Sequence, residues 1–297
     1  MHRAKLSVII ASYNSQKTIE RCLQSFTEQV TAESFEVIVV DSSQDRTGDL
    51  IACHFPGVKL YRFEERKYPG DARNFGVEVA TGEVLAFTDA DCFVPPDWVD
   101  RLIQAHGQTS HPVIGGAVDN GNPDSYIGWA YYFCEFSQWI PQSASCYLDD
   151  IPTTCLSPKR WAFDRYGPFL EGVYCSDTDF NWKLARAGFK PLFVPDIQVS
   201  HINIDNLNDY LGRKVRHGRY FAWMRVKSER FSFLRRAAYV LLWPLLPFLL
   251  FGRRTALVLG KQKYLKEYLL AVPLVFLGLV AWSYGECLGY LSATRRS

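Results

Sequence analysis

The chain lacks several patterns that would assign it at once to a familiar class of protein. Its eight cysteines contain no C-x-x-C pair, and no internal repeat or low-complexity tract is present. Cysteines without metal-ligand spacing indicate reduced thiols in a cytosolic setting. A net charge of only +2 gives no sign of binding to nucleic acid, and we expect no such partner. The first residues also lack a signal-peptide pattern.

The first predicted strand-to-helix turn lacks the glycines of a dinucleotide-binding loop. It reads ASYNS over Ala11–Ser15, whereas close approach of the backbone to a pyrophosphate needs G-x-G-x-x-G. A nucleotide bound here would therefore be held in another way, and a divalent cation would supply the charge that a glycine loop does not.

Apolar runs do alternate with helical patterns over residues 6–203, which is typical of an α/β fold with a doubly wound, mostly parallel sheet. The runs predict strands at Leu6–Ala11, Phe35–Val40, Val58–Phe63, Val84–Thr88 and Val113–Val118, and edge strands within Lys190–Val199. Helices are predicted at Ser15–Gln29, Pro69–Ala80, Pro95–Ala105 and Ser176–Ala187. Residues 124–170 are less periodic and indicate an inserted, substrate-facing region.

Two carboxylates, Asp89 and Asp91, directly follow the predicted strand at 84–88. Desolvating bare charges at the end of a buried strand is costly, so these side chains must face a cleft, a cation or both. Hard cations such as Mg²⁺ and Mn²⁺ prefer oxygen ligands of this kind. Taken alone, the pair would also fit an acidic, solvated turn.

Five motifs in a fixed order resemble the family 2 glycosyltransferases, which have the GT-A fold. They are LSVIIASYN (Leu6–Asn14), VIVVDSSQD (Val37–Asp45), GDARNFG (Gly70–Gly76), TGEVLAFTDAD (Thr81–Asp91) and SDTDFNWKLARAG (Ser176–Gly188). The resemblance covers roughly residues 5–220. It implies an inverting enzyme that uses a nucleotide-diphosphate sugar and a divalent metal, Mn²⁺ or Mg²⁺.

The resemblance also implies roles for residues around the donor. Tyr13 matches the residue that packs on the nucleobase, and Asp41 matches the carboxylate that reads the base. Arg73 matches a residue near the base or the phosphates, and Asp89 matches the ribose-side carboxylate of the D-x-D motif. Plain packing for Tyr13 and capping of the next helix by Asp41 are the structural alternatives.

For the chemistry itself, the resemblance implies that Asp91 ligates the metal and that Asp177 is the general base. His201 lies where some family members place another metal ligand, although a lone histidine is often structural. The glutamate that usually precedes the base is Ser176 here, so Asp179 remains a substitute for Asp177, which could also cap its helix. A carboxylate base suits the reaction, because the acceptor hydroxyl must lose its proton as it attacks.

The composition changes after Asn206. We expect a catalytic domain over residues 1–205, a basic amphipathic helical region over 206–236 and membrane-associated helices over 237–297. Two uncharged segments, Ala237–Phe251 and Tyr268–Gly285, are short for spanning a bilayer. The loop expected at 252–267 is as basic as the outer flanks, so the positive-inside rule gives a spanning hairpin no support.

We therefore expect in-plane or re-entrant helices on the cytoplasmic face of a membrane, with two spans or a soluble helical subdomain as alternatives. The processive motif Q-x-x-R-W is absent, which favours transfer of a single sugar. The expected acceptor is a membrane-borne glycan or glycolipid, and the favoured donor is a UDP-sugar. A polyprenyl-phosphate glycosyltransferase and a catalytically silent sugar-nucleotide-binding or scaffold protein are the alternatives.

Overall fold

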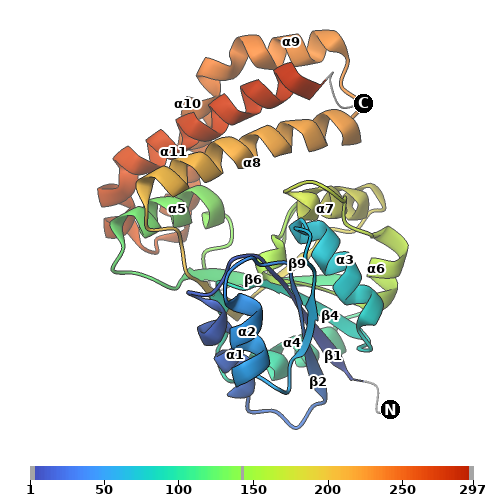
Figure 1. Ribbon diagram of the computed structural model, residues 1–297. Coiled ribbons are helices and arrows are strands. Elements are labelled where there is room, and N and C mark those ends of the chain that lie inside the picture. The colour runs from blue at the N-terminus through green and yellow to red at the C-terminus, as the bar shows by residue number, and fades with distance from the viewer. Residues whose placement is uncertain (1–3, 142–143, 294–297) are drawn as a thin grey trace. The chain divides into compact units, whose positions relative to one another are not determined.

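A computed structural model describes residues 4–141 and 144–293. The chain divides into two compact units (Figure 1). The first unit contains Met1–Gly121 and Pro141–Ile202, and the second contains Asn122–Ile140 and Asn203–Ser297. The second unit thus takes its first helix from within the α/β region. The domain boundaries expected at residues 205 and 236 stay a prediction.

The first unit is built on one mixed sheet, which has nine strands in the described part of the chain. They are β1 Leu6–Ser12, β2 Phe35–Asp41, β3 Lys59–Arg62, β4 Val84–Asp89, β5 Cys92–Phe93, β6 Val113–Asn120, β7 Cys146–Tyr147, β8 Leu156–Pro158 and β9 Leu192–His201. The order is β3-β2-β1-β4-β8-β6-β9-β5, and β7 pairs with β9. The pairs β3–β2, β2–β1, β1–β4 and β6–β9 are parallel, as predicted.

Helices cover the two faces of this sheet (Figure 1). They are α1 Ile19–Thr27, α2 Thr47–His54, α3 Pro69–Val79, α4 Trp98–Gln108, α6 Arg160–Tyr166 and α7 Ser176–Arg186. On one face Phe26 of α1 packs edge-on against Trp98 of α4. On the other face Phe87 of β4 packs against Phe163 and Phe169. Burial of these rings on both sides fixes the direction of β4 and therefore the place where its terminal carboxylates emerge.

Three expectations for this unit need correction. β9 is not an edge strand, because β6 pairs with it on one side and β5 on the other. The region 124–170 is more regular than its weak periodicity indicated: it supplies helices and the three-residue strand β8, which lies antiparallel between β4 and β6. Its substrate-facing role stays a prediction. Helix α1 begins at Ile19 rather than Ser15, because the preceding residues form a turn in which Ser15 O accepts from the Thr18 and Ile19 N–H groups.

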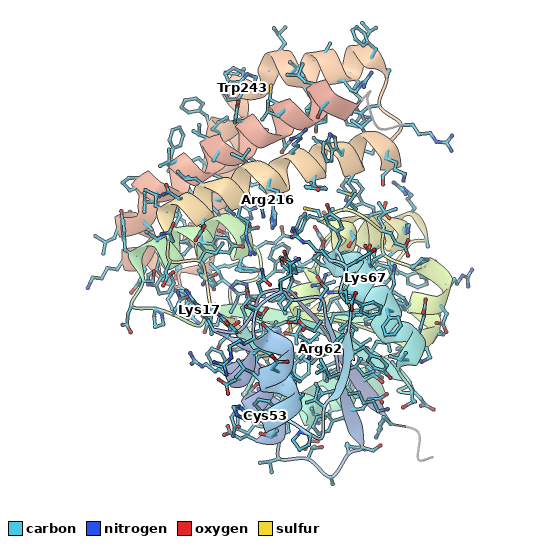
Figure 2. All side chains as sticks on the ribbon, in the orientation of Figure 1. Lys17, Cys53, Arg62, Lys67, Arg216 and Trp243 are labelled. Atoms are coloured by element: carbon cyan, nitrogen blue, oxygen red, sulfur yellow. The ribbon has the colours of Figure 1, made fainter. Side chains whose placement is uncertain are left out.

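The second unit is helical. It contains α5 Tyr126–Phe136, α8 Leu207–Ser228, α9 Phe233–Leu242, the 3₁₀ turn η2 Trp243–Leu245, α10 Leu246–Lys261 and α11 Leu265–Ser292. α9, η2 and α10 together, Phe233–Lys261, and α11 are each long and apolar enough to cross a membrane by length and composition. Figure 2 labels Trp243 at the break between α9 and α10 and Arg216 on α8.

The prediction of a loop over residues 252–267 is wrong. α10 continues through Lys261, and only Gln262–Tyr264 separates it from α11, with Gln262 and Tyr264 in the left-handed conformation. Residues 253–259 contain neither glycine nor proline, so nothing in that stretch stops the helix before its last turn. α11 extends beyond the uncharged segment Tyr268–Gly285 and includes Glu286, whose carboxylate accepts from the Trp282 indole N–H at 2.6 Å.

Helices α8 and α11 run side by side in the same direction (Figure 1). Three glycines allow the close approach: a Cβ at Gly218 would collide with the Trp282 carbonyl, and Cβ atoms at Gly285 and Gly289 would collide with the α8 backbone. Tyr210 donates to the Leu274 carbonyl at 3.1 Å, so the contact extends along most of both helices. α8 and α11 therefore form one rigid pair.

Candidate active site

The carboxyl ends of β1, β2 and β4 place the predicted donor residues in one row. In the parallel register Ser12 pairs with Asp41, and Ala11 pairs with Asp89. Tyr13 follows β1 directly, and the Asn14 N–H donates to Ser43 Oγ at 2.7 Å, which ties the ends of β1 and β2 together. Ligands bind at this edge of open α/β sheets. Tyr13, Asp41 and Asp89 thus share one edge.

Asp89 is not free, although no basic residue stands near it in sequence. One of its oxygens pairs with the Arg73 guanidinium of α3, and the other accepts from Thr154 Oγ1 at 2.8 Å. Burial alone would raise the pKa of Asp89, but Arg73, Thr154 and His201 together lower it below its ordinary value. Arg73 is itself buried, and its Nε has no hydrogen-bond partner in the described structure. An anionic or hydroxyl ligand would satisfy that donor.

Asp91 and His201 meet because β5 pairs with β9. Cys92 lies opposite His201 in this antiparallel pair, and the Ile202 N–H donates to the Asp91 carbonyl at 2.8 Å. His201 Nε2 lies 3.4 Å from Asp91 Oδ1, and its side chain is buried. Possible ligand atoms of Asp89, Asp91, Cys92 and His201 all lie within 4.8 Å of one another. The sheet therefore assembles a cluster that could hold a metal ion.

The donor set of this cluster fits a hard or borderline divalent cation. Two carboxylates and one imidazole suit Mn²⁺, and carboxylates suit Mg²⁺. Burial, followed by the charges of Asp91 and Asp89, raises the pKa of the Cys92 thiol well above its ordinary value. Mn²⁺ and Mg²⁺ prefer oxygen and imidazole ligands to a thiol, so the carboxylates and His201 are the members of this cluster that suit such a cation.

Neither structural alternative for Tyr13 and Asp41 matches the geometry. α2 begins at Thr47, six residues after Asp41, and it is Asp45 that accepts from the Thr47 N–H at 3.0 Å. Asp41 is buried, and its Oδ1 accepts from Ser43 Oγ at 2.5 Å. The Tyr13 ring is half-exposed and lies against the Arg66 guanidinium, 4.2 Å from the ring centroid, rather than in the core. At this edge of the sheet the Tyr13 ring is partly exposed, whereas the Asp41 carboxylate is buried.

Asp177 lies in the first turn of α7, but it is not the N-cap residue, which is Cys175. Its Oδ2 accepts from the Thr153 N–H at 3.2 Å and from the Thr153 hydroxyl at 3.3 Å. Asp179, the substitute for the base, is buried and pairs with Lys183 at 3.0 Å. Asp177 is thus the more accessible of the two carboxylates.

Sequence patterns missed the residues that join these groups. The 3₁₀ turn η1, Thr153–Cys155, places Thr153 on Asp177 and Thr154 on Asp89. Two adjacent threonines therefore connect the predicted base with the D-x-D motif. In the sequence this turn is only a Thr-Thr-Cys triplet before a three-residue strand. Such a short stretch has no hydrophobic periodicity from which its role could be predicted.

Comparison with known proteins decides the family. The profile described as "Glycosyl transferase family 2" matches residues 7–166, which is more than half of the chain. The chain belongs to glycosyl transferase family 2. It is therefore an enzyme, a glycosyltransferase with a sugar-nucleotide donor, and the matched segment contains Tyr13, Asp41, Arg73, Asp89 and Asp91.

Two archaeal relatives extend the likeness beyond the matched domain. "Glycosyltransferase AglE" of Haloferax volcanii is 28% identical over 253 residues, covering 82% of this chain and 81% of the relative. A "dolichyl N-acetyl-alpha-D-glucosaminyl phosphate 3-beta-D-2,3-diacetamido-2,3-dideoxy-beta-D-glucuronosyltransferase" of Methanococcus voltae is 23% identical over 265 residues, covering 82% of this chain and 78% of the relative. Both alignments are longer than the α/β sheet unit of this glycosyltransferase.

Solved structures share its fold. The mannosyltransferase PcManGT from Pyrobaculum calidifontis, in complex with GDP-Man and Mn²⁺, superposes with a TM-score of 0.63 at 21% identity, covering 100% of this chain and 89% of the other. TarS 1-349 of S. aureus, in complex with UDP-GlcNAc, has a TM-score of 0.56 at 18% identity, covering 98% and 92%. The GT-A fold expected from the five motifs is thus confirmed.

Proposed function

We propose that this glycosyltransferase transfers one sugar from a nucleotide-diphosphate sugar to a hydroxyl group of a membrane-borne glycan or glycolipid, with inversion at the anomeric carbon. The observation that carries the proposal is the arrangement of Asp177 and Asp89 on the adjacent threonines of η1. It gives one carboxylate for the acceptor and another for the donor. A single displacement of the diphosphate by the acceptor oxygen inverts the anomeric centre.

The proposed donor is a UDP-sugar, with its base between Tyr13 and Asp41. Asp41 Oδ1 already accepts from Ser43, which leaves Oδ2 for the base. Uracil presents one imide N–H to such an acceptor, whereas guanine presents two adjacent donors that would need both oxygens. Tyr13 supplies an aromatic face for stacking. This support favours uridine over guanosine at the sheet edge.

We propose that Asp91 and His201, with Asp89, hold a divalent cation, Mn²⁺ or Mg²⁺. When bound, the cation supplies positive charge against the charge that develops on the leaving diphosphate. Arg73 holds Asp89 in place and offers the unpartnered Nε to the donor. Asp177 takes the proton of the attacking hydroxyl while Thr153 fixes its orientation.

The competing reaction has a lipid phosphate as acceptor. A phosphate is already ionised and needs no strong base. The carboxylate of Asp177 would repel such an anion, and a second carboxylate, Asp150, is held against the same turn of α7. Two acidic groups at this place favour a neutral hydroxyl as the acceptor, which ranks the polyprenyl-phosphate reaction second.

We propose that the helical unit attaches the protein to the cytoplasmic face of a membrane with its helices in the plane of the interface. Apolar side chains along α9 and α10 are exposed, including Leu241, Phe248 and Leu249. The 3₁₀ turn with Pro244 interrupts the first apolar segment, so neither α9 nor α10 alone is long enough to span.

The packing of α8 on α11 also favours the in-plane arrangement over two spans. Burying α11 in the hydrocarbon core would draw α8 in with it, because the two helices are in contact along their length. Arg216, Arg219 and Lys227 are exposed on α8. Each such charge costs about 2.5–3.5 kcal/mol at the bilayer centre. At the interface the same residues would instead contact anionic headgroups.

A first experiment tests the reaction. The purified protein would be screened with UDP-, GDP- and other nucleotide sugars for a rise in melting temperature with Mn²⁺ and with EDTA, and then incubated with labelled donor and membrane extract. Label in a glycan or glycolipid supports the proposal. Label on polyprenyl phosphate supports the second reaction, and metal-dependent binding without any transfer supports a silent protein.

A second experiment tests the topology. Thr255 is a poor labelling site because its hydroxyl lies 2.6 Å from the Tyr268 hydroxyl. Gly260 has open space around a Cβ and lies near the end of α10. In a background with exposed Cys53 changed to serine, Gly260→Cys should react with a membrane-impermeant maleimide only after the cells are opened. Reaction in intact cells would establish a spanning hairpin.

A further inference from the structure

A second carboxylate, Asp150, lies beside the proposed base on the segment that leads into η1. Its Oδ1 accepts from Asn181 Nδ2 at 2.6 Å, and its Oδ2 accepts from Thr178 Oγ1 at 3.2 Å. Both donors belong to α7, one and four residues after Asp177. Asn181 is fully buried and also donates to the Asp177 carbonyl at 3.0 Å. Asp150 is therefore held against the same turn of α7 that carries Asp177.

The two carboxylates influence each other electrostatically. Burial raises the pKa of Asp150 to about 7, and the charge of Asp177 adds to the increase, against the hydrogen bonds from Thr178, Asn181 and the Ile151 backbone. Other charged groups on these segments form their own ion pairs: Lys190 with Asp149 at 2.7 Å and Lys183 with Asp179 at 3.0 Å. Among these groups, Asp177 is thus the one whose charge raises the pKa of Asp150.

The packing at Ser176 explains why a second carboxylate would come from another segment. Ser176 is buried against Gly70 at the start of α3, where a Cβ would lie 2.8 Å from Ser176 Oγ and 2.6 Å from the Leu170 carbonyl. A glutamate, the usual residue before the base in the resembling motif, would not fit there without moving α3. Asp150 brings a carboxylate to the base from the chain before η1.

We propose that Asp150 and Asp177 titrate as a coupled pair and that Asp150 is a positioning residue that sets the proton affinity of Asp177. The inference rests on the proposed function. In the transfer step the acceptor oxygen bonds to the anomeric carbon, the bond from that carbon to the diphosphate oxygen breaks, and its electron pair leaves with the diphosphate. The hydroxyl proton passes to Asp177. A charged Asp150 beside it makes Asp177 a stronger base, because accepting the proton relieves the repulsion between the two carboxylates.

The test is the pH dependence of kcat/KM for the wild type, Asp150→Asn and Asp149→Asn. In the wild type we expect kcat/KM to rise through about pH 7 as the pair becomes doubly charged. Asp150→Asn should lose that inflection, with a rate at least about tenfold lower at high pH and nearly unchanged at low pH, and with an unchanged KM for the donor. Asp149, whose side chain is 80% exposed, is the matched control and should keep the wild-type profile.

A second readout does not depend on activity. Because the folded-state pKa of Asp150 is raised, its protonated form stabilises the fold below the ordinary pKa of 3.8, and this stabilisation is lost as the pH rises through about 7. The melting temperature of the wild type should therefore fall between pH 5 and pH 8 more than that of Asp150→Asn or Asp177→Asn.

The outcomes separate this inference from the proposed function. An equal loss of rate at every pH in Asp150→Asn, or an unchanged fall in its melting temperature with pH, would overturn the coupling of the two carboxylates. A wild-type enzyme that transfers no sugar to any hydroxyl acceptor would overturn the proposed function, and the melting series would still decide whether the two carboxylates are coupled.

Discussion

The two units of the chain differ in how much of their large apolar side chains they leave exposed. Among the described residues of the sheet unit, only Val30, Tyr147 and Trp161 are large apolar side chains that remain exposed. In the helical unit such exposed side chains occur on α9, α10 and α11. Only 6% of the most apolar window in Phe233–Lys261 is buried, compared with 39% in Leu265–Ser292. Large exposed apolar surfaces mark sites of membrane or protein contact.

The charged residues of the candidate site and those of the helical unit lie in different surroundings. In the sheet unit Asp89, Asp91 and Asp177 end strands or begin a helix, where they remain partly accessible. In the helical unit Lys214 is buried, pairs with Glu135 and lies 4.8 Å from the Tyr131 ring centroid. The first set is available to a ligand, whereas the second holds helices together. We therefore expect substitutions in one unit to change chemistry, and those in the other to change stability or attachment.

The largest effect should come from Asp91→Ala. We expect loss of measurable transfer and of metal-dependent nucleotide binding, because His201 would lose its 3.4 Å neighbour and the cation a carboxylate ligand. Membrane attachment should not change. Asp97→Ala is the control, since Asp97 is half-exposed and pairs only with Arg101 on the same helix among the ion pairs of the described residues. Nucleotide binding that is equally tight in EDTA would contradict the prediction.

Asp177→Asn should lower kcat by about 10²–10⁴, the usual contribution of a general base, with little change in the KM for the donor. Asparagine keeps an oxygen that can accept from Thr153, so the fold should remain intact. The comparison is Asp179→Asn, which removes the charge that Lys183 pairs with. If Asp179→Asn is the crippling change and Asp177→Asn is mild, the assignment of the base is wrong.

The sequence predicts those residues of the site that follow segments with a clear hydrophobic periodicity. Asp41 and Asp89 follow apolar runs whose period identifies strands, so their common edge was predictable. The ion pair of Arg73 with Asp89 was not, because the register between α3 and β4 leaves no mark in either segment. β8 is too short for any period, and α5 is apolar on nearly all sides, so it has no amphipathic pattern. No sequence pattern identified the site residues of that same region, which are Asp150, Thr153 and Thr154.

In the helical unit we expect Lys214→Met to destabilise the fold by about 3–5 kcal/mol, because it leaves the Glu135 carboxylate partly buried without its closest cation. Burial would raise the pKa of Glu135, but Lys214, His217 and Arg254 lower it to about 2, so its stabilising contribution is lost as the pH falls from about 4.5 towards 2. In the variant the pKa of Glu135 is lowered less, so this loss of stability between about pH 4.5 and 2 should be smaller.

Chemical unfolding in detergent, followed at several pH values, would measure the effect of Lys214→Met. Lys227→Met removes an exposed lysine from the same helix and should change stability little. The transfer rate of folded Lys214→Met protein on a soluble acceptor should match the wild type. A specific loss of kcat without loss of stability would show that the helical unit contributes to the chemistry and would break the contrast between the units.

The smallest effect concerns attachment. Leu241 and Phe248 are 80% and 65% exposed on α9 and α10, and each side chain that leaves water for lipid gains about 1.5–3 kcal/mol. Replacing both with serine should therefore shift protein from the membrane to the soluble fraction by about two to four orders of magnitude in the partition coefficient, as measured by vesicle flotation. Release should stay incomplete at low salt, because the exposed arginines of α8 still attract anionic lipid, and should increase as salt screens that attraction.

Val30→Ser, which removes a 74% exposed apolar side chain from the sheet unit, should leave flotation unchanged. If Val30→Ser releases the protein as strongly as the double substitution does, membrane attachment does not depend specifically on the apolar side chains of the helical unit.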